Sequence, residues 1–413
     1  MSEEPVTYDG SDIQVLEGLE AIRKRPGMYV GSTSERGLHE LVYAVVGRAV
    51  NEVLAGRAGS VEVVLTPDGG VRVTDDGPGI PVEAAGDAGG GPVLEALLTR
   101  PHAGADPSGR HAVPMSMFGI GLCVANALSS RLTAEVRRTG VRWVQEYVRG
   151  VALTPPVVAG PATGTGTTIA FWPDAGIFGT ATQCSYAVLA EHFRELAFLN
   201  RRMDISLTDA RTPGRSRPVR FHFPGGARDF LAYLVTRRGT PVAPAHLDVF
   251  GFECEWEDVR MAATAEVALH WYGSGEERIE GFANSRPNPD GGTHVDGFRD
   301  GVAAAVNAYA RQHRLLTSAD PDLGADRIGE GLTAVVSVKL DRPEFHGATN
   351  GRLGGAVVRV RVGQAVRDRL GAWLEQDPER AAALIGRIVR GTPRDRAGRA
   401  GALWTEADRA PGL

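Results

Sequence analysis

A run of apolar residues with helical spacing sets the first requirement that any fold of this chain must meet. Leucine, valine and alanine recur at intervals of three and four residues over 38–54, which predicts a helix with one buried face. Two valine-rich runs, 61–66 and 71–74, follow with turn residues between them, and they predict two short strands. The chain then continues as Asp75-Asp76-Gly77-Pro78-Gly79-Ile80-Pro81, a loop whose glycines allow the backbone to approach a neighbour closely.

The rest of the chain mixes strand and helix patterns. Residues 85–116 are rich in glycine, proline and alanine, which predicts a loop that flanks a short helix over 93–99. A polar stretch rich in arginine and proline, 209–218, is the expected domain boundary. Further strands are expected near 131–137, 142–149, 166–172, 262–271, 278–284 and 332–339, and further helices from near Gly119 to 128 and near 295–313 and 355–376. The sequence therefore predicts an α+β protein of two domains.

Length and composition limit the class of protein. A chain of 413 residues is too long for one ordinary core, and a formal net charge of −5 argues against a basic surface for nucleic acid over the whole protein. No apolar run approaches the roughly 18 residues of a membrane span, and the acidic start lacks the pattern of a signal peptide. Three scattered cysteines form neither a disulfide framework nor a zinc site. We therefore expect a cytoplasmic protein without a membrane partner.

Three glycine motifs can each serve a ligand or serve the fold alone. A buried Asp75 at the end of a strand can accept a hydrogen bond from an amino group such as that of adenine, although a DxGxG sequence by itself is more often a surface turn. Gly119-Ile120-Gly121 opens the expected helix, where a phosphate can bind, and Gly164-Thr165-Gly166-Thr167 precedes a strand. By itself, each of the last two motifs is more often a packing device.

The order and spacing of these motifs resemble the GHKL ATPases, a superfamily that includes gyrase and histidine kinases, and within it the B protein of gyrase. Further matching motifs are Tyr8-Asp9 with residues 13–31, Phe171-Trp172-Pro173, and residues 196–200, 290–294 and 330–339. The resemblance covers nearly all of the chain. It implies a GHKL (Bergerat) ATPase sandwich with an amino-terminal dimerisation arm over 1–220, a transducer domain of ribosomal-S5-domain-2-like fold over 221–392, and a tail over 393–413. It also implies that the TOPRIM domain of gyrase B, and with it DNA cleavage, is absent.

The positions that perform hydrolysis in the family differ here. The family's first long helix places a general base and a Mg²⁺ ligand at the positions of Ala44 and Arg48. Alanine cannot take a proton, and a guanidinium has no lone pair for a cation. Glu52 lies roughly 12 Å along the helix axis from Ala44, too far to act on the same water, and it is expected to pair with Arg48 for a few tenths of a kcal/mol. The resemblance thus gives no catalytic residue and no metal ligand.

The positions that bind phosphate differ as well. Met115 and Ser116 replace two glycines of the family's lid, and Asp106 stands where the family has a lysine. Residues 348–350 read Ala-Thr-Asn, where the family's transducer loop reads Gln-Thr-Lys and touches the γ-phosphate. Neither of the two lysines in the chain stands at a phosphate position. Because catalytic groups act as a unit, hydrolysis is expected to be lost or very slow.

The positions that hold adenine in the family are retained. The resemblance implies that the cofactor-binding residues are Val45, Asp75, Gly77, Gly79, Ile80, Gly119, Gly121, Arg138 and Thr167. Arg138 matches an arginine that aminocoumarin antibiotics contact in gyrase B, whereas a neighbouring family arginine is Pro78 here. The expected cofactor is ATP, ADP or an adenine-like ligand, bound without Mg²⁺. The alternative is that these residues persist because the fold needs them.

Three functions stay open. In the first, the chain is a degenerate gyrase-B-like paralogue, a pseudo-ATPase that binds a small-molecule ligand, a gyrase subunit, or itself as a homodimer through residues 1–31. In the second, it is an ATPase fragment of a gyrase-B-type, ATP-dependent DNA topoisomerase in which Glu40 or Glu52 acts as the base. In the third, a remodelled site performs a new reaction in specialised metabolism, with acid–base groups drawn from His102, Asp106 and His111.

One segment carries a local excess of positive charge. Residues 352–399 contain eleven arginines and five acidic residues, a local charge of +6. The segment is either a contact for a DNA backbone or a solvated arginine face. Contact with DNA is therefore expected to be weak or absent.

Overall fold

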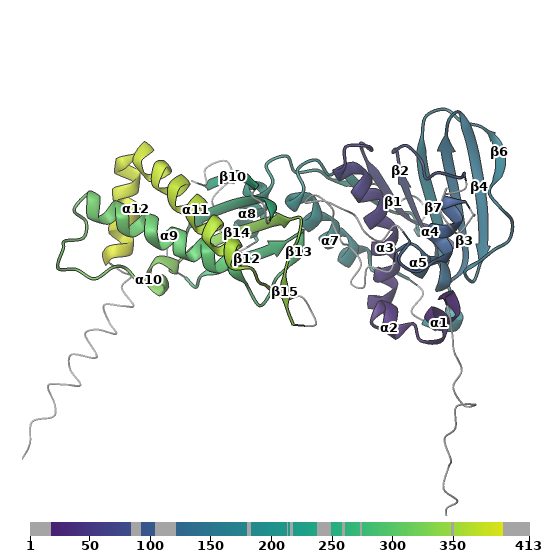
Figure 1. Ribbon diagram of the computed structural model, residues 1–413, viewed down its shortest axis with the longest axis horizontal. Coiled ribbons are helices and arrows are strands. Elements are labelled where there is room, and N and C mark those ends of the chain that lie inside the picture. Colours follow the sequence, from purple (N-terminus) through teal and green to yellow (C-terminus); the bar gives the residue numbers. More distant parts are fainter. Residues whose placement is uncertain are drawn as a thin grey trace, which may run out of the picture. The chain divides into compact units, whose positions relative to one another are not determined.

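The computed structural model describes most of the chain, and Figure 1 shows how its helices and strands are arranged. The described residues are 18–83, 92–103, 121–179, 183–212, 214, 218–237, 249–257, 261–272, 275–347 and 351–390. They divide into two compact units. The first unit holds the described residues up to 197 together with 202–222, and the second holds 198–201 and the described residues from 223 on.

The first unit alternates helices and strands. Its helices are α1 (Gly18–Lys24), α2 (Gly27–Val30), α3 (Glu35–Leu54), α4 (Val93–Thr99), α5 (Cys123–Ala127), α6 (Ala175–Phe178) and α7 (Tyr186–Leu199), whose last two residues belong to the second unit. Its strands are β1 (Val61–Leu65), β2 (Val71–Asp75), β3 (Ser129–Arg138), β4 (Val141–Val148), β5 (Val151–Ala152), β6 (Val157–Pro161), β7 (Gly166–Pro173), β8 (Ile205–Asp209) and β9 (Val219–Phe221).

These elements form a helix-on-sheet sandwich. Nine strands of the described residues make one sheet in the order β5-β4-β3-β7-β2-β1-β8-β9, with β6 also paired to β4. Helix α3 packs against β1 and β2, and α5 packs against β3 and β7, so both helices cover one face of the sheet (Figure 1). The apolar stripe of α3 is buried there, including Leu38, Leu41 and Val42, all of which are fully buried. This layer places the middle of α3 beside the end of β2, where the candidate site lies.

The second unit is built on a smaller sheet. Its helices are α8 (Ala227–Thr236), α9 (Thr293–Gln312), α10 (Ala325–Gly329), α11 (Ala356–Gln376) and α12 (Pro378–Arg390). Its strands are β10 (Phe250–Glu257), β11 (Ala262–Trp271), β12 (Arg278–Ala283), β13 (Arg286–Pro287), β14 (Leu332–Leu340), β15 (Phe345–His346) and β16 (Arg352–Leu353). In the described part of this unit, five strands pair in the order β10-β11-β14-β12-β13.

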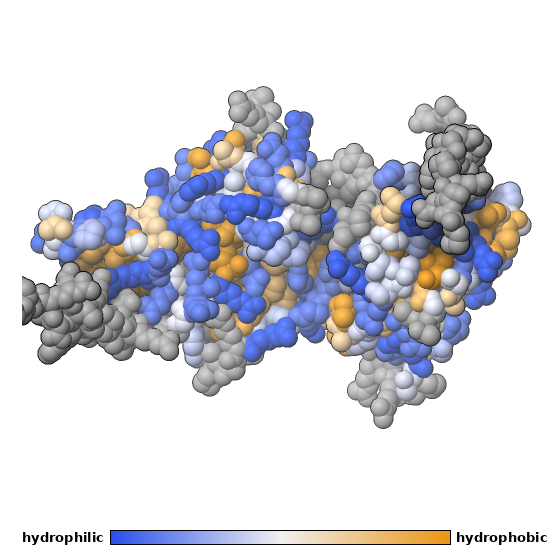
Figure 2. Space-filling model, turned by 90° about the horizontal axis from the view of Figure 1, so that it is seen from below, coloured by the Kyte–Doolittle hydropathy of each residue, from blue (hydrophilic) through white to orange (hydrophobic). Residues whose placement is uncertain are grey.

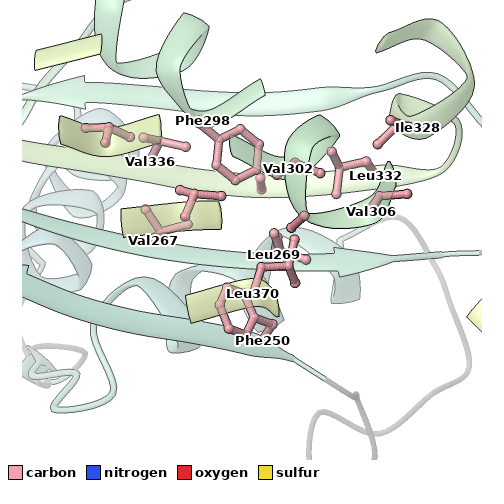
Figure 3. Packing of buried hydrophobic residues seen from close by; sticks show 14 of the residues in the cluster. Phe250, Val267, Leu269, Phe298, Val302, Val306, Ile328, Leu332, Val336 and Leu370 are labelled. Atoms are coloured by element: carbon pink, nitrogen blue, oxygen red, sulfur yellow. The ribbon is translucent and has the colours of Figure 1, made fainter. Parts of the chain in front are cut away.

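Helices cover both faces of this second sheet. Alternate residues of β14 point to opposite faces, so that Val336 joins the core under α9 and α11 while Val335 joins the smaller cluster under α8. Figure 3 shows Phe298 and Val302 of α9 and Leu370 of α11 in the larger core. Apolar residues that recur every second position on the strands and about every 3.6 positions on the helices therefore account for both clusters.

Two glycines allow α9 and α11 to approach each other closely. A Cβ atom on Gly297 would lie 2.3 Å from the carbonyl oxygen of Arg359, and one on Gly301 would lie 2.5 Å from the carbonyl oxygen of Gly363. No side chain fits at either distance. The contact between these two long helices therefore depends on backbone meeting backbone.

Polar residues cover most of the face of the molecule drawn in Figure 2, and apolar residues lie there in separate patches. Exposed large apolar side chains do occur in the described residues, such as Met28 on α2, Val151 on β5 and Val360 on α11. No helix in the part of the chain that the structure describes is long and apolar enough to cross a membrane.

Most of the predicted elements are confirmed, with one correction. The helix expected over 38–54 is α3, the helix expected over 93–99 is α4, and the strand expected near 262–271 is β11. The helix expected from near Gly119 is wrong at its beginning, because α5 begins only at Cys123. Gly121, just before it, has a φ of +88°, which is not a helical value. Gly119 itself and most of the expected loop over 85–116 lie outside the described residues.

The first turn of α9 contains a histidine in an unusual environment. His294 is fully buried, and neither of its ring nitrogens has a hydrogen-bond partner among the described residues. Burial disfavours the charged form and lowers the pKa of His294 from 6.5 to about 4. The nearby positive charge of Arg352 acts in the same direction.

This histidine predicts a pH dependence of stability. The pKa of His294 is lower in the folded than in the unfolded chain, so protonation of this histidine favours the unfolded state. The free energy of unfolding is therefore highest above pH 6.5 and falls as the pH drops towards 4, by about 3 kcal/mol in total. Urea unfolding at pH 7.5 and pH 4.5 measures the loss. A His294→Leu variant should lose less stability over this interval than the original chain. Equal losses in the two proteins would contradict the prediction.

Candidate functional site

The candidate site is built around Asp75, the last residue of β2. Its side chain is 2% exposed, and its backbone is paired with that of Thr167 on β7. The amide of Gly77 donates to Asp75 Oδ1 over 3.0 Å. The Asp75 side chain thereby closes a turn with the backbone two residues further on. A buried carboxylate with one oxygen bonded to its own loop is thus held in a single orientation at the end of the strand.

An arginine on α3 is bonded to the other oxygen of this carboxylate. Arg48 Nη1 lies 2.7 Å from Asp75 Oδ2. The Arg48 side chain is 19% exposed and the Asp75 side chain 2% exposed, so the ion pair is largely shielded from water. A charge-assisted bond of this length is among the stronger hydrogen bonds in a protein.

The pair expected between Arg48 and Glu52 is only a secondary contact. Arg48 Nη2 and Glu52 Oε1 are 3.7 Å apart, longer than a hydrogen bond. The other oxygen of Glu52 instead accepts from Arg57 Nε over 2.7 Å. The expected ion pair between Arg48 and Glu52 is therefore present. Arg48 makes a shorter ion pair with Asp75, because the strand next to the helix places a more deeply buried carboxylate within its reach.

The electrostatic balance at Asp75 is set by opposing effects. Burial is the largest effect and raises the pKa of the Asp75 carboxyl above its ordinary value, although the charge of Arg48, the amide of Gly77 and the hydrogen bond from Arg48 each lower it. The charge of Glu52 adds a smaller effect that raises it. Because Asp75 is nearly inaccessible to water, Arg48 is the group that compensates its negative charge.

The position of the family's general base is apolar in this chain. Ala44 lies on α3 and is 8% exposed, and the neighbouring Val45 is also buried. Glu40, one turn before Ala44 on the same helix, is a buried acidic residue. Glu52 is already engaged by Arg57 and faces Arg48. Neither glutamate stands at the position of Ala44.

The loop after Asp75 is fixed by close backbone contacts. Gly79 has a φ of +77°, and a Cβ atom there would lie 2.8 Å from the carbonyl oxygen of Arg137. The amide of Ile80 donates to Thr167 Oγ1 over 3.2 Å, and both residues are buried. A Cβ atom on Gly166 would lie 2.3 Å from the carbonyl oxygen of Asp75. The expected ligand residues Gly79, Ile80 and Thr167 are therefore brought together, and these contacts alone give each of them a structural role.

Arg138 is directed to the same loop. Its Nη1 lies 3.3 Å from the carbonyl oxygen of Gly79 and 3.4 Å from that of Pro78. Its Nε lies 4.0 Å from Glu83 Oε1. The structure thus brings Arg138 next to the glycine loop, in contact with backbone.

Several expected site residues lie outside the described residues. These are Asp106, His111, Met115, Ser116, Gly119 and residues 348–350. His102 is described, and it is an exposed residue with a φ of +61°.

A divalent cation does not fit the described residues of this site. Arg48, at the position of the family's Mg²⁺ ligand, presents only N–H donors and bonds to the buried carboxylate of Asp75. No three acidic, histidine or cysteine side chains among the described residues come together as a metal site. A Mg²⁺ ion near Asp75 would meet a fixed positive charge instead of free oxygen ligands.

Comparison with known proteins identifies the family. A family profile described as "DNA gyrase B" matches residues 226–401, and one described as "Histidine kinase-, DNA gyrase B-, and HSP90-like ATPase" matches residues 33–177. The chain is similar to the 43K ATPase domain of Thermus thermophilus gyrase B, solved in complex with an aminocoumarin. The two are 31% identical with a TM-score of 0.77, and the similarity covers 94% of this chain and 98% of that one. This chain belongs to the DNA gyrase B family. Its fold is accordingly a GHKL ATPase sandwich followed by a transducer domain, as the sequence predicts.

Curated gyrase B proteins are similar over nearly the whole chain. The DNA gyrase B protein of Streptomyces coelicolor is 42% identical over 400 residues, which are 93% of this chain and 57% of that protein. The novobiocin-sensitive DNA gyrase B protein of Streptomyces niveus is 39% identical over 93% of this chain and 58% of that protein. The chain therefore spans little more than half the length of these relatives.

Proposed function

We propose that this gyrase-B-type domain is a pseudo-ATPase, which binds a ligand or a partner without hydrolysing ATP. The observation that carries the proposal is the ion pair between Arg48 Nη1 and Asp75 Oδ2 at 2.7 Å. It fixes a positive charge where the family binds Mg²⁺ and engages the carboxylate that the family uses for adenine. The proposal assigns the ATPase-like domain to residues 1–220 and the transducer to 221–392.

The absence of a proton acceptor at position 44 supports the same conclusion. A general base contributes typically 10²–10⁴ in rate, and Ala44 has no group that accepts a proton. Glu52 lies roughly 12 Å further along the helix and is bonded to Arg57. An attacking water near Ala44 therefore has no base from this face of α3 except Glu40, one turn away.

The proposed ligand site consists of Val45, Asp75, Gly77, Gly79, Ile80, Gly121, Arg138 and Thr167, together with Gly119. Candidate ligands are ATP, ADP or another planar ring compound, bound without a metal. Candidate macromolecular partners are a second copy of this chain through residues 1–31 and a gyrase subunit. The proposed role is thus binding, with the ancestral ATPase fold as its scaffold.

ATP turnover in the presence and absence of Mg²⁺ tests this proposal. Phosphate release by the purified chain should be at least about 100-fold slower than release by a gyrase B ATPase fragment that has the family's glutamate and asparagine at the positions of Ala44 and Arg48. Addition of EDTA should leave the residual rate of the chain unchanged. Mg²⁺-dependent turnover at the rate of the reference fragment would refute the proposal.

A second candidate function is a working gyrase-B-type ATPase with rearranged catalytic residues. The observation in its favour is the position of Glu40, which is buried on the same helix as Ala44 and one turn away. Under this alternative, Glu40→Gln should lower Mg²⁺-dependent turnover by at least about 100-fold. Under the pseudo-ATPase proposal, Glu40→Gln leaves the very low turnover unchanged.

A further inference from the structure

The geometry points to a change of ligand class: Arg48 turns the Asp75 end of the site from a hydrogen-bond acceptor into a donor, so that it selects a neutral planar ring bearing a carbonyl oxygen over one bearing an amine. This inference rests on the proposed function, because it concerns what binds at the same site. It names the chemistry of the ligand edge that meets Arg48.

Asp75 is a poor acceptor for a ligand because its oxygens are already bonded. Oδ1 accepts from the amide of Gly77 over 3.0 Å, and Oδ2 accepts from Arg48 Nη1 over 2.7 Å. The side chain is 2% exposed, which leaves little room for a third donor. An exocyclic ring amine that approaches Asp75 would meet the N–H groups of Arg48, and two donors facing each other do not bond.

Arg48 has more donors than its contact with Asp75 uses. A guanidinium carries five N–H groups in one plane. Arg48 Nη1 bonds to Asp75, whereas Arg48 Nη2 comes only to 3.7 Å from Glu52. Its side chain remains 19% exposed, so a ligand can reach it. The ion pair with Asp75 restricts the motion of the guanidinium and thereby reduces the entropy lost when a carbonyl oxygen bonds to it.

The charge of the surrounding cluster favours a neutral ligand edge. Arg48 and Arg57 supply two positive charges, and Asp75 and Glu52 supply two negative charges, within one set of ion pairs. The sum is zero, so a carboxylate on the ligand would bring an uncompensated charge to a partly buried place. A ring carbonyl accepts from Arg48 without that penalty.

A pair of nucleotides tests this inference directly. ADP and IDP carry the same ribose and phosphates, but the hypoxanthine ring of IDP has a carbonyl where adenine has an amine, and its adjacent ring nitrogen carries a hydrogen. We would titrate each into the chain by calorimetry in the presence of EDTA. We expect IDP to bind at least about tenfold more tightly than ADP, which is the effect of one hydrogen bond made or lost.

Substitution of Arg48 shows whether this residue causes the preference. In Arg48→Asn, Asp75 is released as an acceptor, and we expect the preference to reverse so that ADP binds more tightly than IDP. Arg359→Asn is the matched control, because Arg359 makes an ion pair of the same length, 2.7 Å, with Asp300 in the second unit and takes no part in the cluster around Asp75; it should keep the preference for IDP. Unfolding midpoints of both variants establish that they are folded.

Two results would overturn the inference. One is tighter binding of ADP than IDP by the original chain, with a ratio that Arg48→Asn leaves unchanged. The other is binding of neither nucleotide by the original chain or by Arg48→Asn at millimolar concentration. Failure of the proposed function is a different result, Mg²⁺-dependent turnover of ATP, and it is measured without IDP.

Discussion

Replacing Phe298 by alanine is expected to lower the free energy of unfolding of the second unit by about 3–5 kcal/mol. The Phe298 side chain is fully buried in the larger core, where Figure 3 shows it beside Val302 and Val336. Removing the ring leaves a cavity between α9 and the sheet, and the surrounding side chains cannot close it fully in a densely packed interior. Urea unfolding followed by far-ultraviolet circular dichroism measures the change.

A matched substitution on the surface separates the effect of the cavity from that of truncation. Val360 lies on α11 and is 56% exposed, so Val360→Ala removes apolar atoms without opening a cavity. We expect it to change the free energy of unfolding by no more than about 0.5 kcal/mol. If Phe298→Ala costs no more than Val360→Ala, the assignment of Phe298 to the centre of this core is wrong.

Periodicity predicted the long elements well because their burial is one-sided. Helices α9 and α11 bury one stripe each against the sheet, and the apolar repeat reports that stripe directly. Strand β10 was not among the predicted elements, although Phe252, Cys254 and Trp256 alternate with glutamates along it. That period of two is a usable strand signal. The glutamates, which disfavour a strand by propensity, obscured it because they lie on its exposed side.

The candidate site could be predicted only in part. The motif around Asp75 and Gly79 predicts the loop, because the positive φ of Gly79 is a property of one residue and its near neighbours, which a short motif can record. The pairing of Arg48 with Asp75 is not local, since 27 residues and a change of layer separate the two. Helical spacing reveals only neighbours three and four residues away, and for Arg48 it indicated Glu52. The orientation of the Arg48 side chain becomes visible only when α3 is packed on β2.

The ion pair between Arg48 and Asp75 also predicts the effect of restoring the family's residues at positions 44 and 48. We expect the double variant Ala44→Glu, Arg48→Asn to hydrolyse ATP at least about 100-fold faster than the original chain in the presence of Mg²⁺. The glutamate supplies a proton acceptor at position 44, and removal of the guanidinium ends both the positive charge and the bond to Asp75 Oδ2. Phosphate release under saturating Mg²⁺ and ATP measures the gain.

The two single variants show whether the positions act together. Ala44→Glu alone keeps the Arg48–Asp75 pair, and Arg48→Asn alone has no base at position 44, so each should gain far less than the double variant. Ala44 is 8% exposed, and a glutamate there is partly desolvated, so the unfolding midpoint of each variant must be measured beside its rate. Measurable Mg²⁺-dependent turnover in the original chain, unchanged in a folded double variant, would assign hydrolysis to rearranged residues and support the alternative in which Glu40 is the base. A large gain confined to the double variant would instead mean that Ala44 and Arg48 jointly prevent hydrolysis, since every other position is the same in the four proteins.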